Sequence, residues 1–235
     1  MSDYALQRLN MVESQVRPSD LTDRRIARAM LAMPREQFVP QSVRSFCYTD
    51  RDLPLLAGNG AGDLAGDGAG DGAGVQRYLL APRVQAKLIQ VLDAPETGIV
   101  LDIGCGLGYS TAILSRLAET VVGIETDPDM IETARGLFAE NEITNASVFQ
   151  GPLTDGYDEQ GPYDCILLNG AVSDVPPSLL DQLKDGGRLA AVLHEGAVGR
   201  ATEWTRHGGQ FAKRAVFDAE APTLPGFEKV ETFVF

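Results

Sequence analysis

Two carboxylates and three glycines in the middle of the chain have a spacing suited to binding a small ligand. Asp102 follows a short apolar run and starts the pattern D-x-G-x-G-x-G, whose glycines are Gly104, Gly106 and Gly108. Glu125 ends the next apolar run. Glycine lets a backbone pass close to a ligand because it has no Cβ. A carboxylate at the end of a neighbouring strand can accept hydrogen bonds from both hydroxyls of a ribose, so these residues predict a nucleoside site.

The surrounding residues predict the elements that position these groups. Ile99–Leu101 is an apolar run typical of a strand buried on both faces. From Tyr109 the apolar residues recur at helical spacing, which predicts a helix directly after the glycine turn. Val121–Ile124 predicts a second strand. Ligands of such sheets bind outside the carboxyl ends of the strands, where this turn would lie.

The glycine spacing separates two classes of cofactor. A dinucleotide site has the pattern G-x-G-x-x-G, but Tyr109 stands where its third glycine is needed. The acid of the motif suits a cationic amino-acid tail and is unfavourable beside a pyrophosphate, and S-adenosyl-L-methionine (SAM) has such a tail and no phosphate. We therefore predict SAM, with a glycine turn that binds no ligand as the alternative. The predicted cofactor-binding residues are Asp102, Gly104, Cys105, Gly106, Gly108, Glu125, Thr126, Pro152, Leu153 and Asn169.

The composition of the chain restricts the classes of partner that it can bind. A net charge of −13 over 235 residues, without a cluster of Lys and Arg, argues against a nucleic-acid substrate. The sequence contains no apolar run long enough to cross a membrane, and its first residues lack the apolar core of a signal peptide. We therefore expect a cytoplasmic protein with no membrane partner.

The cysteines and histidines predict no metal site. Cys47, Cys105 and Cys165 are scattered and odd in number, which is typical of a reducing compartment. With only two histidines in the chain, His194 and His207, we expect no zinc site.

The order of predicted elements indicates one α/β domain over residues 1–235. It has an N-terminal helical layer (1–57), a Gly/Asp-rich segment (58–74), and a core with a β-rich C-terminal tail (78–235). We predict a doubly wound, mostly parallel, seven-stranded Rossmann-like sheet with an antiparallel edge hairpin. Helices are expected over 3–16, 23–31, 82–92, 128–141 and 176–183, and further strands over 146–149, 163–169, 188–194, 200–206, 210–217 and 230–235.

The segment Gly58–Gly74 is a near-repeat of glycine, alanine and aspartate. Its composition predicts a flexible loop, because ordering so many glycines costs much conformational entropy. Its aspartates are also similar to those of calcium-binding glycine-rich repeats, but the apolar anchors of those repeats are absent.

Several motifs resemble the protein-L-isoaspartate O-methyltransferase family. They cover residues 8–195 and comprise NMVESQ (10–15), MPREQFVP (33–40), YTD (48–50), LDIGCGLGYSTA (101–112), PYD (162–164) and QLKDGGRL (182–189). The resemblance implies SAM-dependent methyl transfer to the carboxylate of an isoaspartyl residue in a protein or peptide.

Two positions depart from the family pattern. Leu80 stands where the family has a serine near the transferred methyl and the substrate carboxylate, in Leu80-Ala81-Pro82. After the third strand of the sheet, Gly151-Pro152-Leu153 replaces Gly-Asp-Gly, whose acid usually faces the adenine. We therefore expect weak isoaspartyl activity, and no catalytic residue is assigned.

Three functions stay open, namely the isoaspartyl methyltransferase, a methyltransferase for another small-molecule acceptor, and a SAM-binding protein without catalysis. The predicted substrate-side residues are Leu80, Pro82, Asn169 and His194. A hydroxyl acceptor would need a base, and His194 at the end of the fifth strand is the available histidine, with a surface or capping role as its alternative.

Overall fold

The computed structural model describes residues 3–55, 77–195 and 198–229. The predicted strand 230–235 and the Gly/Asp-rich segment 58–74 lie outside these ranges. The N-terminal layer contains α1 (Tyr4–Met11), a π-helical turn (Val12–Val16), 3₁₀ turns and α2 (Arg24–Ala32). Asp23 caps α2 by accepting a hydrogen bond from the Arg25 backbone N–H. The single helix predicted over 3–16 is thus α-helical only to Met11.

The seven-stranded mostly parallel sheet is confirmed, with strand order β5-β4-β3-β6-β7-β8-β9. The first five strands are parallel, and β8 and β9 form the predicted antiparallel edge hairpin. The strands are β3 (Ile99–Ile103), β4 (Thr120–Glu125), β5 (Ala146–Gln150), β6 (Tyr163–Val172), β7 (Leu183–Glu195), β8 (Val198–His207) and β9 (Gln210–Asp218).

Helices cover both faces of this sheet. The remaining helices are α3 (Pro82–Leu92), α4 (Tyr109–Leu114), α5 (Pro128–Glu140) and α6 (Pro177–Leu180). One hydrophobic cluster joins the N-terminal layer, α3, α4 and α5 to one face, and a second joins α6 and the C-terminal tail to the other. Residues alternate between the faces along β3, so that Val100 belongs to the first cluster and Leu101 to the second. The N-terminal layer therefore shares a continuous core with the sheet.

The helix predicted over 176–183 is shorter in the structure. α6 ends at Leu180, and Leu183 already pairs with Tyr163 in the sheet. The Gln182 side-chain amide donates to the carbonyls of Asp155 and Ser178, which fixes the chain as it leaves the helix. Tertiary pairing of Leu183 thus ends a helix that the local sequence would continue.

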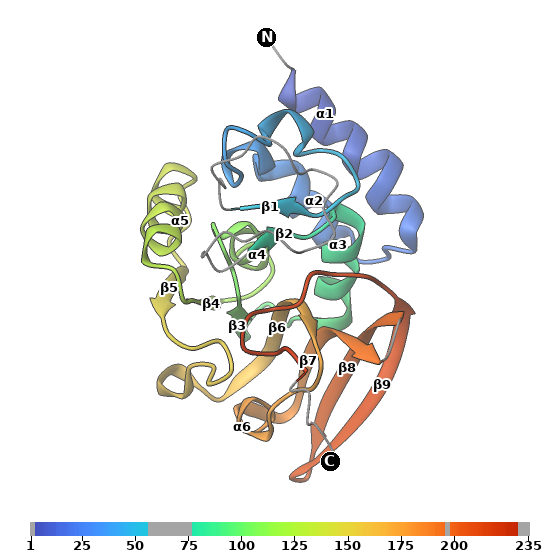
Figure 1. Cartoon of the computed structure of the whole chain (residues 1–235), viewed down its shortest axis with the longest axis vertical. Helices are drawn as coiled ribbons and strands as arrows, with labels where there is room; N and C mark the ends of the chain where they lie inside the picture. The colour runs from blue at the N-terminus through green and yellow to red at the C-terminus, as the bar shows by residue number, and fades with distance from the viewer. Residues whose placement is uncertain (1–2, 56–76, 196–197, 230–235) are drawn as a thin grey trace, which may run out of the picture.

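A small antiparallel sheet, absent from the sequence predictions, connects the N-terminal layer to α3. It consists of β1 (Leu53–Pro54) and β2 (Tyr78–Leu79). Figure 1 shows these strands between the N-terminal helices and the strands of the main sheet. We call the described residues 53–55 and 77–79 the strap. Among the described residues, no helix is long and apolar enough to cross a membrane.

Candidate functional site

The glycine turn lies at the carboxyl end of β3, as predicted. Gly104, Gly106 and Gly108 all have positive φ angles, of 73°, 56° and 89°. Side chains other than glycine rarely adopt this conformation, so the backbone explains the three glycines. The backbone N–H groups of Gly104 and Cys105 donate to the Ile124 carbonyl, which fastens the turn to the end of β4.

Asp102 is fully buried and is the centre of a polar network at the end of β3. One carboxylate oxygen accepts hydrogen bonds from the hydroxyls of Ser110 (2.7 Å) and Thr111 (2.6 Å) on α4. The other accepts from the Asn169 side-chain amide on β6, and Asn169 in turn accepts from the Gln85 amide on α3 at 3.0 Å. The network thus joins four elements, β3, α4, β6 and α3, around the turn.

The environment of Asp102 changes its acidity. Burial raises the pKa of its carboxyl to about 6, although the hydrogen bonds from Thr111, Ser110 and Asn169 lower it. The negative charge of Glu125 raises the pKa further. This carboxylate therefore carries its charge at neutral pH at a cost, which a cationic ligand group would offset.

Glu125 is buried at the end of β4, beside the turn. Its oxygens accept hydrogen bonds from the backbone N–H groups of Gly106 (2.9 Å) and Thr126 (2.7 Å). They also accept from Arg77 of the strap, whose guanidinium lies 2.9–3.0 Å away. The exposed fractions of the Arg77 and Glu125 side chains are 2% and 0%. Arg77 is a site residue that the sequence analysis missed.

The other predicted cofactor residues divide into two groups. Cys105 is buried beside Gly123, and burial raises the pKa of its thiol well above the ordinary value, which favours the neutral form. Leu153 is buried with its Cδ1 atom 3.6 Å from the point where a Cβ on Gly104 would lie. Pro152 is exposed, two residues after the end of β5.

The substrate-side predictions divide in the same way. Leu80, Asn169 and the glycine turn line one small cavity of about 10 Å³, and Pro82 starts α3 two residues after Leu80. His194 instead lines a separate hollow with Ser173 and Glu195, and its Nε2 atom lies 3.5 Å from Glu220. The structure therefore does not bring His194 to the glycine turn.

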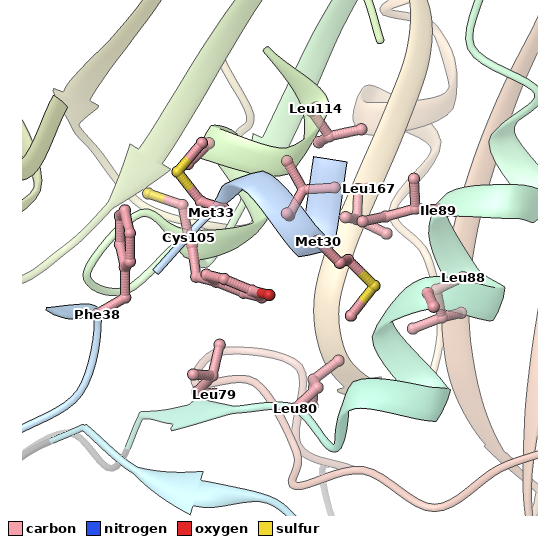
Figure 2. Close-up of a cluster of buried hydrophobic side chains, with 14 of the residues drawn as sticks. Met30, Met33, Phe38, Leu79, Leu80, Leu88, Ile89, Cys105, Leu114 and Leu167 are labelled. Atoms are coloured by element: carbon pink, nitrogen blue, oxygen red, sulfur yellow. The ribbon is translucent and has the colours of Figure 1, made fainter. Parts of the chain in front are cut away.

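Leu80 has a buried side chain and a firmly held backbone. Figure 2 shows it beside Leu79 in the cluster that contains Met30 and Leu88. Arg35, which is fully buried, donates to the Leu80 carbonyl at 2.8 Å and to the Cys47 carbonyl at 2.7 Å. A buried arginine of the N-terminal layer thus fixes the backbone two residues before α3.

Comparison with known proteins agrees with this architecture. The family model described as "Protein-L-isoaspartate(D-aspartate) O-methyltransferase (PCMT)" matches residues 7–216. The chain belongs to this family. It is 35% identical to a protein-L-isoaspartate O-methyltransferase of Methanoculleus marisnigri over 79% of this chain and 76% of the relative. It is 33% identical to the enzyme of Koribacter versatilis over 80% of this chain and 77% of the relative.

Solved structures of this family share the fold. One protein-L-isoaspartate O-methyltransferase superposes with a TM-score of 0.77 at 24% identity, covering 93% of this chain and 66% of that chain. A Plasmodium falciparum structure of the same description, in complex with S-adenosyl-L-homocysteine (SAH), gives a TM-score of 0.71 at 20% identity, covering 92% and 97%. The protein is therefore a SAM-dependent methyltransferase of this family, which confirms the predicted family, fold and cofactor class.

The residues of the turn are chemically suited to SAM. Glycines with positive φ permit close approach of a ligand, and Glu125 stands at the strand end where a ribose would be bound. In this structure, however, the hydrogen bonds of Glu125 are made to groups of the chain itself. The residues fit the cofactor provided that Arg77 leaves Glu125.

Proposed function

We propose that this chain transfers the methyl group of SAM to a carboxylate, and that it methylates isoaspartyl peptides slowly. When bound, SAM supplies a methyl group on a positively charged sulfur, which an acceptor oxygen displaces in line. A carboxylate acceptor is already ionised at neutral pH, so it needs positioning and desolvation rather than a general base. Among the described residues, no histidine, aspartate or glutamate lines the small cavity at the turn, which supports a carboxylate acceptor over a hydroxyl.

The roles proposed for the residues follow from their positions. Glu125 and the backbone of Gly106 would hold the ribose, and Asp102 would favour the cationic tail through its negative charge. Asn169, which donates to Asp102, would line the space between cofactor and acceptor. Leu80 would exclude water there, because its side chain is apolar and buried.

The observation that carries the slow isoaspartyl reaction is the identity and burial of Leu80. A leucine cannot donate a hydrogen bond to an acceptor carboxylate, and an anion left unpaired beside it is costly. Ser110 and Thr111 carry the aliphatic hydroxyls closest to the turn in sequence, but both already donate to Asp102. Loss of one oriented donor typically lowers a rate by about 100-fold.

Replacement of Leu80 tests this function. Leu80→Ser restores a donor, and Leu80→Ala removes the same apolar contacts without adding one. With radiolabelled SAM and an isoaspartyl peptide, we expect slow turnover by the natural protein, at least tenfold faster turnover by the Ser variant, and no gain by the Ala variant. Rapid turnover by the natural protein with no gain from Leu80→Ser would contradict the proposal.

A second candidate is a small apolar carboxylic acid as the acceptor. Apolar side chains form part of the lining of the cavity at the turn, namely those of Phe38, Leu55, Leu79, Leu80 and Leu107. The same assay with short aromatic and aliphatic acids tests this candidate. Faster transfer to such an acid than to the isoaspartyl peptide would favour it, whereas SAH binding without transfer to either would favour a non-catalytic role.

A further inference from the structure

Arg77 occupies lone-pair positions on the Glu125 carboxylate that the hydroxyls of a ribose would need. Glu125 Oε1 accepts from Arg77 Nε and Nη2 and from Thr126, and Oε2 accepts from Arg77 Nε and Gly106. A carboxylate has about four lone-pair positions in all. Two ribose hydroxyls could not bind Glu125 while the guanidinium remains there.

Leu55, which lies opposite Arg77 in the strap, fills the space above the glycine turn. Its Cδ1 atom lies 2.4 Å from the point where a Cβ on Gly106 would be. The close approach that glycine permits is therefore used by a side chain of the protein itself. The Leu55 backbone N–H donates to the Arg77 carbonyl at 2.8 Å, so the two blocking residues are directly linked.

Little space is left between these groups. The cavity that Leu55, Gly104 and Leu80 help to line measures about 10 Å³. This is roughly the volume that one water needs, whereas small-molecule sites measure roughly 300–1,000 Å³. A cofactor of the size of SAM cannot enter without movement of the strap.

The strap has features of a segment that can be displaced. Its two strands have two residues each, and isolated two-stranded sheets are marginally stable. Arg77 Nη1 is buried without a hydrogen-bond partner, so the guanidinium is incompletely satisfied in this position. Release of Arg77 would let that nitrogen reach water.

We propose that the strap closes the cofactor site, and that Arg77 competes with the cofactor for Glu125. The inference rests on the proposed SAM site at this turn. Binding then requires the Arg77–Glu125 pair to open first, and the apparent affinity is reduced by the fraction of molecules in which it is closed. Arg77 thereby sets the cofactor concentration at which the protein becomes loaded.

Calorimetry with SAH as the probe tests this competition. We expect Arg77→Gln to bind SAH at least tenfold more tightly than the natural protein, and to melt at a lower temperature without SAH. The matched control is Arg83→Gln, because Arg83 pairs with Asp50 at the surface, with exposed fractions of 56% and 30%. The control should bind SAH as the natural protein does.

The direction of the change in SAH affinity distinguishes competition by Arg77 from a favourable contact between Arg77 and the cofactor. Unchanged or weaker binding by Arg77→Gln would overturn the inference, since a guanidinium that contacts the cofactor favourably would give weaker binding. No SAH binding by any folded variant would instead overturn the proposed cofactor site, and the inference with it.

The kinetics of the natural protein provide a test that needs no variant. If opening precedes binding, the observed association rate should level off at high SAH concentration in a stopped-flow experiment. A rate that rises linearly to the highest accessible concentration would contradict a closed strap. This measurement decides the question even if Arg77→Gln does not fold.

Discussion

Arg77–Glu125 beside the glycine turn and Lys213–Glu195 at the β8–β9 hairpin are ion pairs with similar N–O distances, of 2.9 and 2.8 Å. Their surroundings differ completely. The first pair is 2% and 0% exposed, and the second is 47% and 55% exposed. Water and salt screen the second pair, so its net effect on stability is small. In the first pair, the contact with the opposite charge compensates each group for the water that it has lost. Removal of one partner therefore leaves the other charge buried and destabilises the fold. Similar contacts can therefore have very different energetic consequences.

Removal of Glu125 should have the largest effect. Glu125→Ala leaves the Arg77 guanidinium buried without a carboxylate to pair with, which we expect to lower the free energy of unfolding by about 3–5 kcal/mol. Urea unfolding measures this loss. The control is Glu195→Ala, which should leave the unfolding midpoint unchanged within error. Equal losses in the two variants would contradict the contrast between the buried pair at the glycine turn and the exposed pair at the hairpin.

Protonation of Asp102 should have the next largest effect on stability. Its folded-state pKa of about 6 lies above the ordinary value of 3.8, so between these values the folded state holds a proton that the unfolded state has lost. The free energy of unfolding should therefore fall by about 3 kcal/mol as the pH rises through this window, and this contribution should be constant above it.

Asp102→Asn isolates this contribution from that of the other carboxylates. Relative to the natural protein, the variant should gain stability between pH 4 and pH 6.5, and urea unfolding at several pH values measures the difference. A difference that does not change with pH would show that Asp102 titrates at its ordinary pKa when folded.

Filling the turn should have a smaller effect on stability and a large effect on binding. Gly106→Val places a β-branched residue at a φ of +56° and against Leu55, which we expect to cost about 1–3 kcal/mol of unfolding free energy and to abolish SAH binding. Calorimetry and urea unfolding check both. Gly136→Val on α5 is the control and should retain binding, because a new Cβ there would meet no other part of the protein within 4 Å beyond its chain neighbours and the backbone of its own helix.

Much of the fold could be predicted because the residue patterns that specify these helices and strands involve residues close together in the sequence. The helix α3 was predicted with the bounds that the structure shows, because Pro82 starts it and its apolar residues recur at helical spacing. The central strands were predicted from continuous apolar runs, and Glu125 was correctly placed at a strand end next to the glycine turn. These features depend on a few neighbouring residues.

The strap could not be predicted in the same way. Leu53–Pro54 and Tyr78–Leu79 are too short to show an alternating pattern, and the glycine-rich stretch separates them in sequence. Nothing local marks Arg77 as buried, since an arginine is normally exposed and its burial here results from the distant Glu125. The one local signal for its burial was its position as a single cation directly before Tyr78-Leu79. The network of Gln85 and Asn169 was equally hidden, because it joins α3 to β6.

The edge of the sheet at β9 bears on how copies of the protein behave at high concentration. An edge strand offers backbone groups that can pair with another chain and start aggregation. β9 carries Lys213 and Arg214 at its centre, and Arg214 also pairs with Glu203 on β8. Two molecules that joined edge to edge would bring these cations together and would have to desolvate them. The cations on β9 therefore oppose the pairing of this edge strand with a strand of a second molecule.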